Sequence, residues 1–292
     1  MNTVVIDKKD LSISINNKTL HIEDKKIPLR LIDTLIINSS TKLLASDIIK
    51  MTKENIIILF ISSNGTDSAI VNSTKTKSAH LKANQYKAHL KDSMPIAKYL
   101  LKEKIKTHTN HLLSHEIRID INDLLEKIDK SNNLKELLGV EGSFSKLYFK
   151  YYFNLLPKSM HKGKRSKRPP LDPANALLSF FYSLFYNFLT IRLLSFGFEP
   201  SIGFLHTPFR SHNALSSDIL EIFRADINEF VLNILKNRKV LKDDFTKRGG
   251  VYLRYSGRKK LWKDYKNFTS SLSSRVDFEI SNIRAMICKE EF

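Results

Sequence analysis

Three short segments of this 292-residue chain hold side chains that could do chemistry. Residues 138–142, Leu-Gly-Val-Glu-Gly, place an acid between two glycines. Residues 203–208, Gly-Phe-Leu-His-Thr-Pro, place a histidine in an apolar, turn-like setting. Residues 218–224, Asp-Ile-Leu-Glu-Ile-Phe-Arg, hold two acids three positions apart and an arginine three further on. Carboxylates, imidazole and guanidinium are the groups used for proton transfer and for binding ions.

Each segment also has a purely structural explanation. Glu141 is explained by a helix start after a glycine-flanked break between helices. His206 is explained as a semi-buried histidine whose hydrogen bonds are satisfied within the fold. Asp218 and Glu221 have the spacing of a capping box, with the aspartate as N-cap and the glutamate at the third helical position. The residues by themselves leave both kinds of explanation open.

Several enzyme classes lack their sequence signatures here. The chain has no G-x-S-x-G, no G-x-x-x-x-G-K-[ST] and no H-E-x-x-H, so serine hydrolysis, P-loop nucleotide hydrolysis and zincin chemistry have no local support. Its single cysteine, Cys288, excludes an intramolecular disulfide and a cysteine-based zinc cluster. Residues 1–20 show no basic start followed by an apolar core, so we expect no signal peptide and a reducing, cytoplasmic compartment.

The charge of the chain is strongly positive and unevenly distributed. Lys and Arg number 48 against 30 Asp and Glu, a formal net charge of +18. Residues 1–78 have 11 basic and 8 acidic side chains, and the remaining 214 residues have 37 and 22, so the net charges are +3 and +15. Such a basic region favours a polyanionic partner, most simply nucleic acid. The alternative is a lysine-rich proteome, since 35 of the 48 basic residues are lysines.

The elements that must position these residues fall into two groups. Up to Ser78, apolar residues alternate with polar ones over 11–15 and 20–22, and Asn16-Asn17 between them indicates a hairpin. The apolar run 55–61 predicts a buried central strand. The remaining elements expected in this half are a helix over 43–52 and a strand over 69–71.

Beyond Ser78 the apolar spacing becomes three and four, which predicts helices. This spacing is set first by Tyr86, Leu90, Ile96, Leu100, Leu101 and Ile105, and helical patterning continues over 111–139 and 217–237. Asp172-Pro173 predicts a helix start. The apolar stretch 176–194 carries polar residues, so we expect a core helix rather than a membrane span. The expected fold class is α+β, with a small N-terminal β-rich domain (1–78) and a larger C-terminal α-helical domain (79–292).

Ordered fragments along the chain resemble one family. The most specific are RPPLDPANALLS at 168–179, GFLHT at 203–207 and DILEIFR at 218–224. Weaker ones are IPL at 27–29, LIDTLIIN at 31–38, NIIILFISSNG at 55–65, Gln85-Tyr86, Glu141-Gly142, Asp244-Phe245, Val251-x-Leu253 and Gly257-Arg258. In this order they resemble Cas1, the CRISPR-associated integrase family of spacer acquisition. The chain departs from the family pattern after the histidine loop, where Arg210 is followed by Ser211, His212 and Asn213.

The resemblance implies a site for a divalent metal, Mg²⁺ or Mn²⁺, with Glu141, His206 and Glu221 as ligands and catalytic residues. Hard carboxylate oxygens with one imidazole suit these ions. Asp218 follows two serines at the expected helix start, so we expect it to cap the helix or to reach the metal through water. Arg224 is expected to hold the Glu221 carboxylate or to contact a phosphate.

The implied reaction is attack of a DNA 3′-hydroxyl on a phosphodiester of the CRISPR array, which inserts a short prespacer. With water as the nucleophile the same site is a metal-dependent endonuclease. The residues expected to bind DNA phosphates are Lys162, Lys164, Arg165, Lys167 and Arg168 in a mobile loop over 158–168, together with Arg210 and Arg224. The alternative explanation of the loop is a solvated charged segment.

The resemblance also implies partners. The catalytic and DNA-binding domain is then 79–292, and 1–78 forms a homodimer, which is consistent with its many apolar strands in a small domain. Two such dimers are bridged by a dimer of the small Cas2 protein, and no membrane is involved. Two competing hypotheses are a non-catalytic DNA-binding scaffold subunit and a solo homologue that acts in a mobile element.

Overall fold

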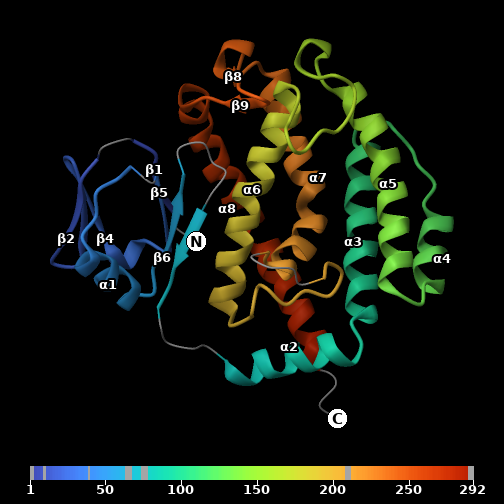
Figure 1. The fold of residues 1–292 in the computed structure, drawn as a ribbon, viewed down its shortest axis with the longest axis horizontal. Coiled ribbons are helices and arrows are strands. Elements are labelled where there is room, and N and C mark those ends of the chain that lie inside the picture. Colours follow the sequence, from blue (N-terminus) through green and yellow to red (C-terminus); the bar gives the residue numbers. More distant parts are fainter. Residues whose placement is uncertain are drawn as a thin grey trace. The chain divides into compact units, whose positions relative to one another are not determined.

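The computed structural model describes residues 3–8, 11–38, 40–62, 68–73, 78–207 and 212–288 (Figure 1). The chain divides into two compact units. Unit 1 comprises residues 1–76 and 258–273, and unit 2 comprises residues 77–257 and 274–292. The expected α+β class is confirmed, because strands dominate the first part of the chain and helices the larger second part.

Unit 1 contains two sheets and a short helix. Its described elements are β1 (Thr3–Ile6), β2 (Ile13–Asn16), β3 (Thr19–Ile22), β4 (Lys25–Pro28), β5 (Thr34–Asn38), α1 (Ala45–Lys53), β6 (Ile57–Ile61) and β7 (Ser68–Val71). One sheet has the order β1-β5-β6-β7, with β7 antiparallel to β6 and the other pairs parallel. The other sheet is the antiparallel β2-β3-β4. The internal position of β6 confirms the strand predicted from the apolar run.

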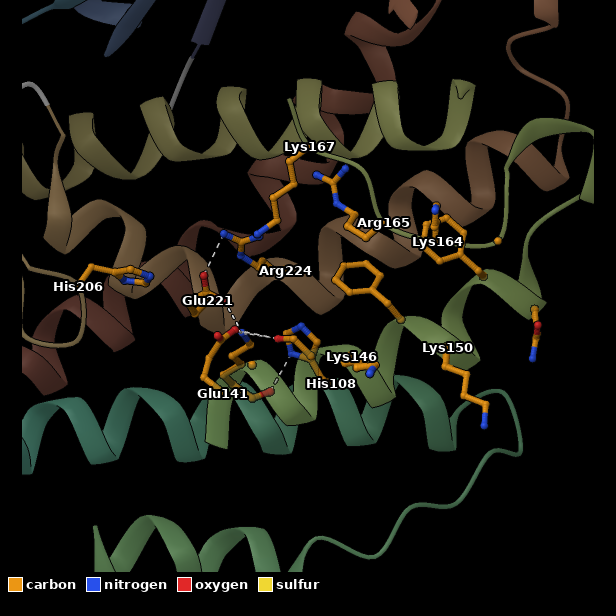
Figure 2. A pocket seen from close by; sticks show the side chains of 17 residues that line it. His108, Glu141, Lys146, Lys150, Lys164, Arg165, Lys167, His206, Glu221 and Arg224 are labelled. Atoms are coloured by element: carbon orange, nitrogen blue, oxygen red, sulfur yellow. Dashed lines mark hydrogen bonds and ion pairs between the residues drawn. The ribbon is translucent and has the colours of Figure 1, made fainter. Parts of the chain in front are cut away.

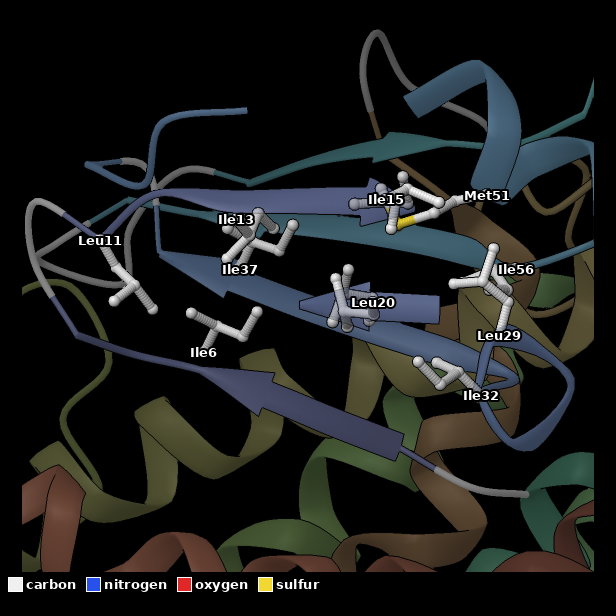
Figure 3. Packing of buried hydrophobic residues seen from close by; sticks show 12 residues of the cluster. Ile6, Leu11, Ile13, Ile15, Leu20, Leu29, Ile32, Ile37, Met51 and Ile56 are labelled. Atoms are coloured by element: carbon white, nitrogen blue, oxygen red, sulfur yellow. The ribbon is translucent and has the colours of Figure 1, made fainter. Parts of the chain in front are cut away.

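The predicted hairpin forms between β2 and β3, with its turn one residue later than expected. Asn16 pairs with Thr19, so Asn17 and Lys18 form the turn, with φ angles of 45° and 55°. Positive φ at both turn residues matches the twist of the flanking strands. Figure 3 shows the apolar side chains that this hairpin contributes to the core, including Ile13, Ile15 and Leu20, together with Ile37 and Met51.

The C-terminal helix α8 (Tyr255–Cys288) was not predicted, and its residues 258–273 belong to unit 1. The serine-rich stretch between Tyr265 and Val276 interrupts the apolar spacing and has low helix propensity, which hides the helix in the sequence. Within unit 1, Arg258 Nε and Trp262 Nε1 donate hydrogen bonds to Asp7 Oδ2, at 3.4 and 2.9 Å. The first strand region and the last helix are therefore joined through one carboxylate.

Unit 2 is built mainly from helices. They are α2 (Ala79–Lys91), α3 (Met94–Leu113), α4 (Asn122–Lys130), α5 (Leu134–Leu155), α6 (Pro173–Phe196) and α7 (Ala214–Lys236), followed by the short strands β8 (Phe245–Lys247) and β9 (Val251–Leu253). Helix α7 packs against both α3 and α6, and α5 packs against α3. Figure 1 shows these four long helices side by side, with α2 lying across one end of them.

Helix α6 begins where the sequence predicts. Asp172 Oδ1 accepts a hydrogen bond from the backbone N–H of Asn175 at 2.8 Å, and Pro173 is the first helical residue. By length and composition α6 is apolar enough to cross a membrane, yet 61% of its most apolar window is buried inside the fold. This burial is typical of the expected core helix.

Helix α2 shows where the periodicity prediction chose the wrong face. Tyr86 and Leu90 are 44% and 81% exposed, whereas Leu81, Gln85 and Ala88 are buried. The Gln85 side chain donates hydrogen bonds to the carbonyl oxygens of residues 199 and 202, at 2.9 and 2.7 Å. It therefore anchors the segment that leads into the histidine loop.

Candidate active site

Glu141 lies within a continuous helix, so the predicted break was wrong. Helix α5 passes through Gly139 and Gly142 without interruption. A glycine inside a helix costs about 1 kcal/mol relative to alanine, and burial of the apolar face outweighs this cost. Within α5, Ser145 Oγ donates a hydrogen bond to Glu141 Oε1 at 2.8 Å. The buried residues of that face include Leu137, Phe144, Tyr148 and Tyr152.

A buried ammonium group joins Glu141 to Glu221. Lys104 of α3 has a side chain only 2% exposed, and its Nζ donates hydrogen bonds to Glu141 Oε1 and to Ser145 Oγ. The same Nζ lies 2.7 Å from Glu221 Oε2 of α7, although this oxygen has no partner in hydrogen-bond geometry. Figure 2 shows the two carboxylates close together in the same pocket. Three helices thus bring two carboxylates to one cation.

Arg224 holds the other oxygen of Glu221. Its Nη2 lies 2.9 Å from Glu221 Oε1, and its guanidinium lies over the ring of Tyr182, 4.6 Å from the centroid. This confirms the first of the two roles expected for Arg224. The arginine fixes the rotamer of Glu221 and leaves Oε2 facing Lys104 and the pocket.

The charges explain why both carboxylates stay ionised. Burial raises the pKa of Glu221, but the positive charges of Arg224 and Lys104 outweigh burial and hold that pKa well below its usual range. Burial likewise raises the pKa of Glu141, but the charge and hydrogen bond of Lys104 together with the hydrogen bond of Ser145 outweigh burial, so the net shift is downward. Two ionised, largely buried carboxylates need a cation between them.

Asp218 organises the histidine loop and does not cap the helix. Helix α7 begins at Ala214, so Asp218 lies inside it, fully buried. Its carboxylate accepts hydrogen bonds from the backbone N–H groups of residues 204, 205 and 206, at 2.6, 3.0 and 2.8 Å. It also accepts one from His206 Nδ1 at 2.7 Å. Because Nδ1 carries the donated proton, Nε2 keeps a lone pair for a ligand.

The close approach of the loop to Asp218 requires Gly203. A Cβ at this position would lie 2.7 Å from Asp218 Oδ2 and 2.8 Å from the backbone carbon of Ala214. Burial lowers the pKa of His206, and the hydrogen bond and charge of Asp218 raise it by more. Asp218 thus sets both the backbone of the loop and the orientation of its imidazole.

Asp218→Asn is expected to lower the free energy of unfolding by about 2–4 kcal/mol. An amide has one acceptor oxygen, and its N–H₂ group would face donors that now point at a carboxylate. Urea denaturation measures the change. Asp123→Asn, at an exposed acid of α4, is the control and is expected to change stability by less than about 0.5 kcal/mol. Equal stability of the two variants would contradict the role given to Asp218.

The structure brings all three expected ligands to one cavity. Glu141, His206 and Glu221 line a cavity of about 790 Å³. Its other charged lining residues are cationic: Lys104, Lys146, Lys150, Lys164, Arg165, Lys167 and Arg224. Figure 2 shows several of these lysines distributed along the pocket away from the carboxylates. Such an arrangement suits a negatively charged polymer that passes over a cation site.

The basic loop over 158–168 contacts the start of α6 through Arg165. Arg165 donates hydrogen bonds to Asn175 Oδ1 and Ser179 Oγ of α6, at 2.9 and 3.1 Å. Lys164 and Lys167 line the cavity, whereas Lys162 and Arg168 are exposed and do not line it. Arg165 thus anchors the loop to α6, and the mobility expected of the loop stays a prediction. Arg210, the remaining phosphate contact expected, lies outside the described residues.

Sequence reasoning missed three lysines and one histidine that line the cavity. Lys146 and Lys150 are exposed on α5, and their i, i+4 spacing was the available signal. Lys104 lies on an apolar helix face between Leu100, Leu101 and Ile105, and a lysine in such a stripe signals a buried ion pair. His108, one turn beyond Lys104, is fully buried, and burial followed by the charge of Lys104 lowers its pKa to about 3.

Comparisons with known proteins agree with the resemblance. The family model described as "CRISPR associated protein Cas1" matches residues 2–267. A CRISPR-associated endonuclease Cas1 of Thermodesulfovibrio yellowstonii is 29% identical over 313 residues, which span 100% of this chain and 98% of the relative.

Solved structures share the fold. A Cas1 protein from Thermotoga maritima has a TM-score of 0.90 at 22% identity, covering 99% of this chain and 97% of that chain. A casposase bound to an integration product has a TM-score of 0.88 at 21% identity, covering 100% and 92%. A chain of a Cas6-RT-Cas1–Cas2 complex has a TM-score of 0.79 at 20% identity, covering 99% and 35%.

Proposed function

This chain belongs to the CRISPR-associated Cas1 family, and we propose that Glu141, His206 and Glu221 form the metal centre with which it cuts and joins DNA. The protein is a DNA endonuclease and integrase of spacer acquisition. The single observation that carries the site proposal is the pair of ionised carboxylates that face one buried cation inside a basic cavity.

The donor set fits a divalent ion. Two carboxylates and the Nε2 atom of His206 offer hard oxygen and imidazole ligands, which suit Mg²⁺ or Mn²⁺. Oε2 of Glu221 is buried and faces the Lys104 ammonium at 2.7 Å without hydrogen-bond geometry, so a metal ion can bind it in place of this contact. The bound ion would polarise a phosphoryl oxygen and stabilise charge on the attacking and leaving oxygens.

The remaining residues orient these ligands and the DNA. Asp218 holds His206, and Arg224 holds Glu221. The cavity lysines bind phosphates and fix the position of the DNA backbone. A 3′-hydroxyl oxygen of the prespacer then forms a new bond to phosphorus in the repeat as the old P–O bond breaks. The number of phosphodiester bonds is unchanged, so the transfer requires no external energy source.

The proposal is tested by strand transfer of a short DNA duplex into a repeat-containing plasmid. We expect product with Mn²⁺ and none with EDTA. Each reaction is run with and without a small Cas2 protein, because Cas2 is named as a partner in the complex of one structural neighbour. DNA binding without transfer in every arm would favour the non-catalytic scaffold. Transfer that resists EDTA would contradict a metal centre.

Replacing four cavity lysines by glutamine is expected to make DNA binding less dependent on salt. Each lost phosphate contact reduces the slope of log affinity against log salt by about 0.9, so the quadruple variant loses roughly 3–4 units of slope. The substituted residues are Lys146, Lys150, Lys164 and Lys167. The control replaces four exposed basic residues of unit 1: Lys25, Lys26, Arg30 and Lys53. Fluorescence anisotropy at several salt concentrations gives both slopes, and equal slopes would assign DNA binding to another surface.

We also propose a homodimer formed through unit 1. Its small size and two sheets favour a partner, since small domains bury a limited fraction of their surface. Light scattering without DNA is expected to give twice the mass of one chain at micromolar concentration. A monomer under these conditions would contradict this interface.

A further inference from the structure

A second cluster of metal-binding side chains lies outside the active-site cavity. His111 lies in the last turn of α3, His115 lies in the turn that follows the helix, and Glu229 comes from α7. One ligand atom from each lies within 4.8 Å of the others. Glu229 is eight residues beyond Glu221 on the same helix, about 12 Å along its axis. None of the three lines the active-site cavity.

The contacts in this cluster converge on one oxygen. Nε2 of His111 and Nε2 of His115 lie 3.0 and 2.8 Å from Glu229 Oε2. Tetrahedral Zn²⁺, with bonds of about 2.0–2.1 Å, keeps its ligand atoms about 3.3–3.4 Å apart. The two nitrogen–oxygen distances therefore need to open by only a few tenths of an ångström to admit the ion.

Neighbouring side chains hold the cluster in place. Tyr148 Oη lies 3.0 Å from His111 Nδ1 and accepts a hydrogen bond from Asn228 Nδ2 at 2.9 Å. Asn233 Nδ2 donates to the second oxygen of Glu229 at 2.9 Å. Metal ligands in proteins are oriented by such outer contacts. The side chains of His111 and His115 are 5% and 19% exposed and that of Glu229 is 37% exposed, so an ion has an entry path.

We propose that His111, His115 and Glu229 bind one Zn²⁺ ion, which ties α3 to α7 independently of the catalytic metal. Two imidazoles and one carboxylate suit a borderline transition metal, whereas the oxygen-rich set of the active site suits Mg²⁺ or Mn²⁺. Each imidazole coordinates through Nε2 and carries its proton on Nδ1, and water completes the tetrahedron. None of the contacts described for these three side chains reaches Glu141, His206 or Glu221, so the site is separate from the catalytic one.

The test uses the full chain dialysed against EDTA, with ZnCl₂ and CoCl₂ as probes. Calorimetry is expected to give one tight Zn²⁺ site per chain, and Co²⁺ is expected to give the visible absorption of tetrahedral coordination. His115→Gln and Glu229→Gln are each expected to weaken Zn²⁺ binding by at least about 10–100-fold. His80→Gln, at an exposed histidine of α2, is the matched control and keeps the affinity.

Glu141→Gln separates this site from the catalytic one. It removes a proposed catalytic ligand, so its Zn²⁺ affinity at the second site is expected to equal that of the unmodified protein. Unchanged binding in both His115→Gln and Glu229→Gln would overturn the proposal, as would loss of binding only in Glu141→Gln. Circular dichroism of each metal-free variant checks the fold. His115 lies in a turn, so its substitution is the one least expected to disturb the fold.

Discussion

Lys104→Met is expected to lower the free energy of unfolding by about 3–5 kcal/mol, because it leaves two buried carboxylates without their shared cation. The methionine side chain keeps much of the volume and removes the charge that now contacts Glu141 and Glu221. Divalent ions are then expected to restore stability, since Mn²⁺ can neutralise the same pair. The increase in Tm on adding Mn²⁺ should therefore be larger in the variant than in the unmodified protein.

The control for this prediction is Lys102→Met, two positions earlier on α3. Lys102 pairs with Asp129 at the surface and is expected to contribute less than about 1 kcal/mol. An equal Mn²⁺ shift in Lys104→Met and in the unmodified protein would contradict the placement of the ion between the two carboxylates. Because the readout is stability, this test does not depend on catalytic activity.

Glu221→Gln is expected to reduce metal-dependent strand transfer by at least about a hundredfold. The amide keeps the shape of the side chain, loses the negative charge and leaves Arg224 and Lys104 with one fewer partner. We therefore expect a folded but less stable protein. Transfer rates at saturating Mn²⁺ and circular dichroism measure the two effects separately.

The control for Glu221→Gln is Glu126→Gln, at an exposed acid of α4 that pairs only with Lys130 among the contacts described. It is expected to retain full transfer. A fully active Glu221→Gln protein would remove Glu221 from the metal centre. Asp218→Asn is also expected to impair transfer, through the orientation of His206, so the two variants are distinguished by Mn²⁺ dependence rather than by activity alone.

Local signals predicted the parts of the fold that depend on few neighbours. The turn between β2 and β3, the apolar run of β6 and the cap at Asp172 are each specified by residues within a few positions of one another. Helix boundaries were predicted less well. The cap predicted at Asp218 is wrong, because the helix begins one turn earlier, at Ala214. The D-x-x-E spacing is the same at a cap and inside a helix, so spacing alone does not distinguish them.

The centre of the site depends on contacts between distant residues. Asp218 receives its hydrogen bonds from residues 12 to 14 positions earlier. Lys104 meets a carboxylate 37 positions away and another on α7. No local pattern records these distances, because they result from how α3, α5 and α7 pack. The family resemblance supplied the candidate ligands, and the packing supplied the cation that joins them.

The hydrogen bond from Trp262 to Asp7 bears on when the protein folds during its synthesis. These residues are 255 positions apart, and both belong to unit 1. A ribosome releases residues 1–76 early, yet Arg258–Ser273 emerges only after nearly all of unit 2 has been made. The part of the nascent sheets that residues 258–273 cover therefore stays exposed until that segment has been made. Contacts of such long sequence separation form slowly, and this interval is when the chain is most exposed to aggregation.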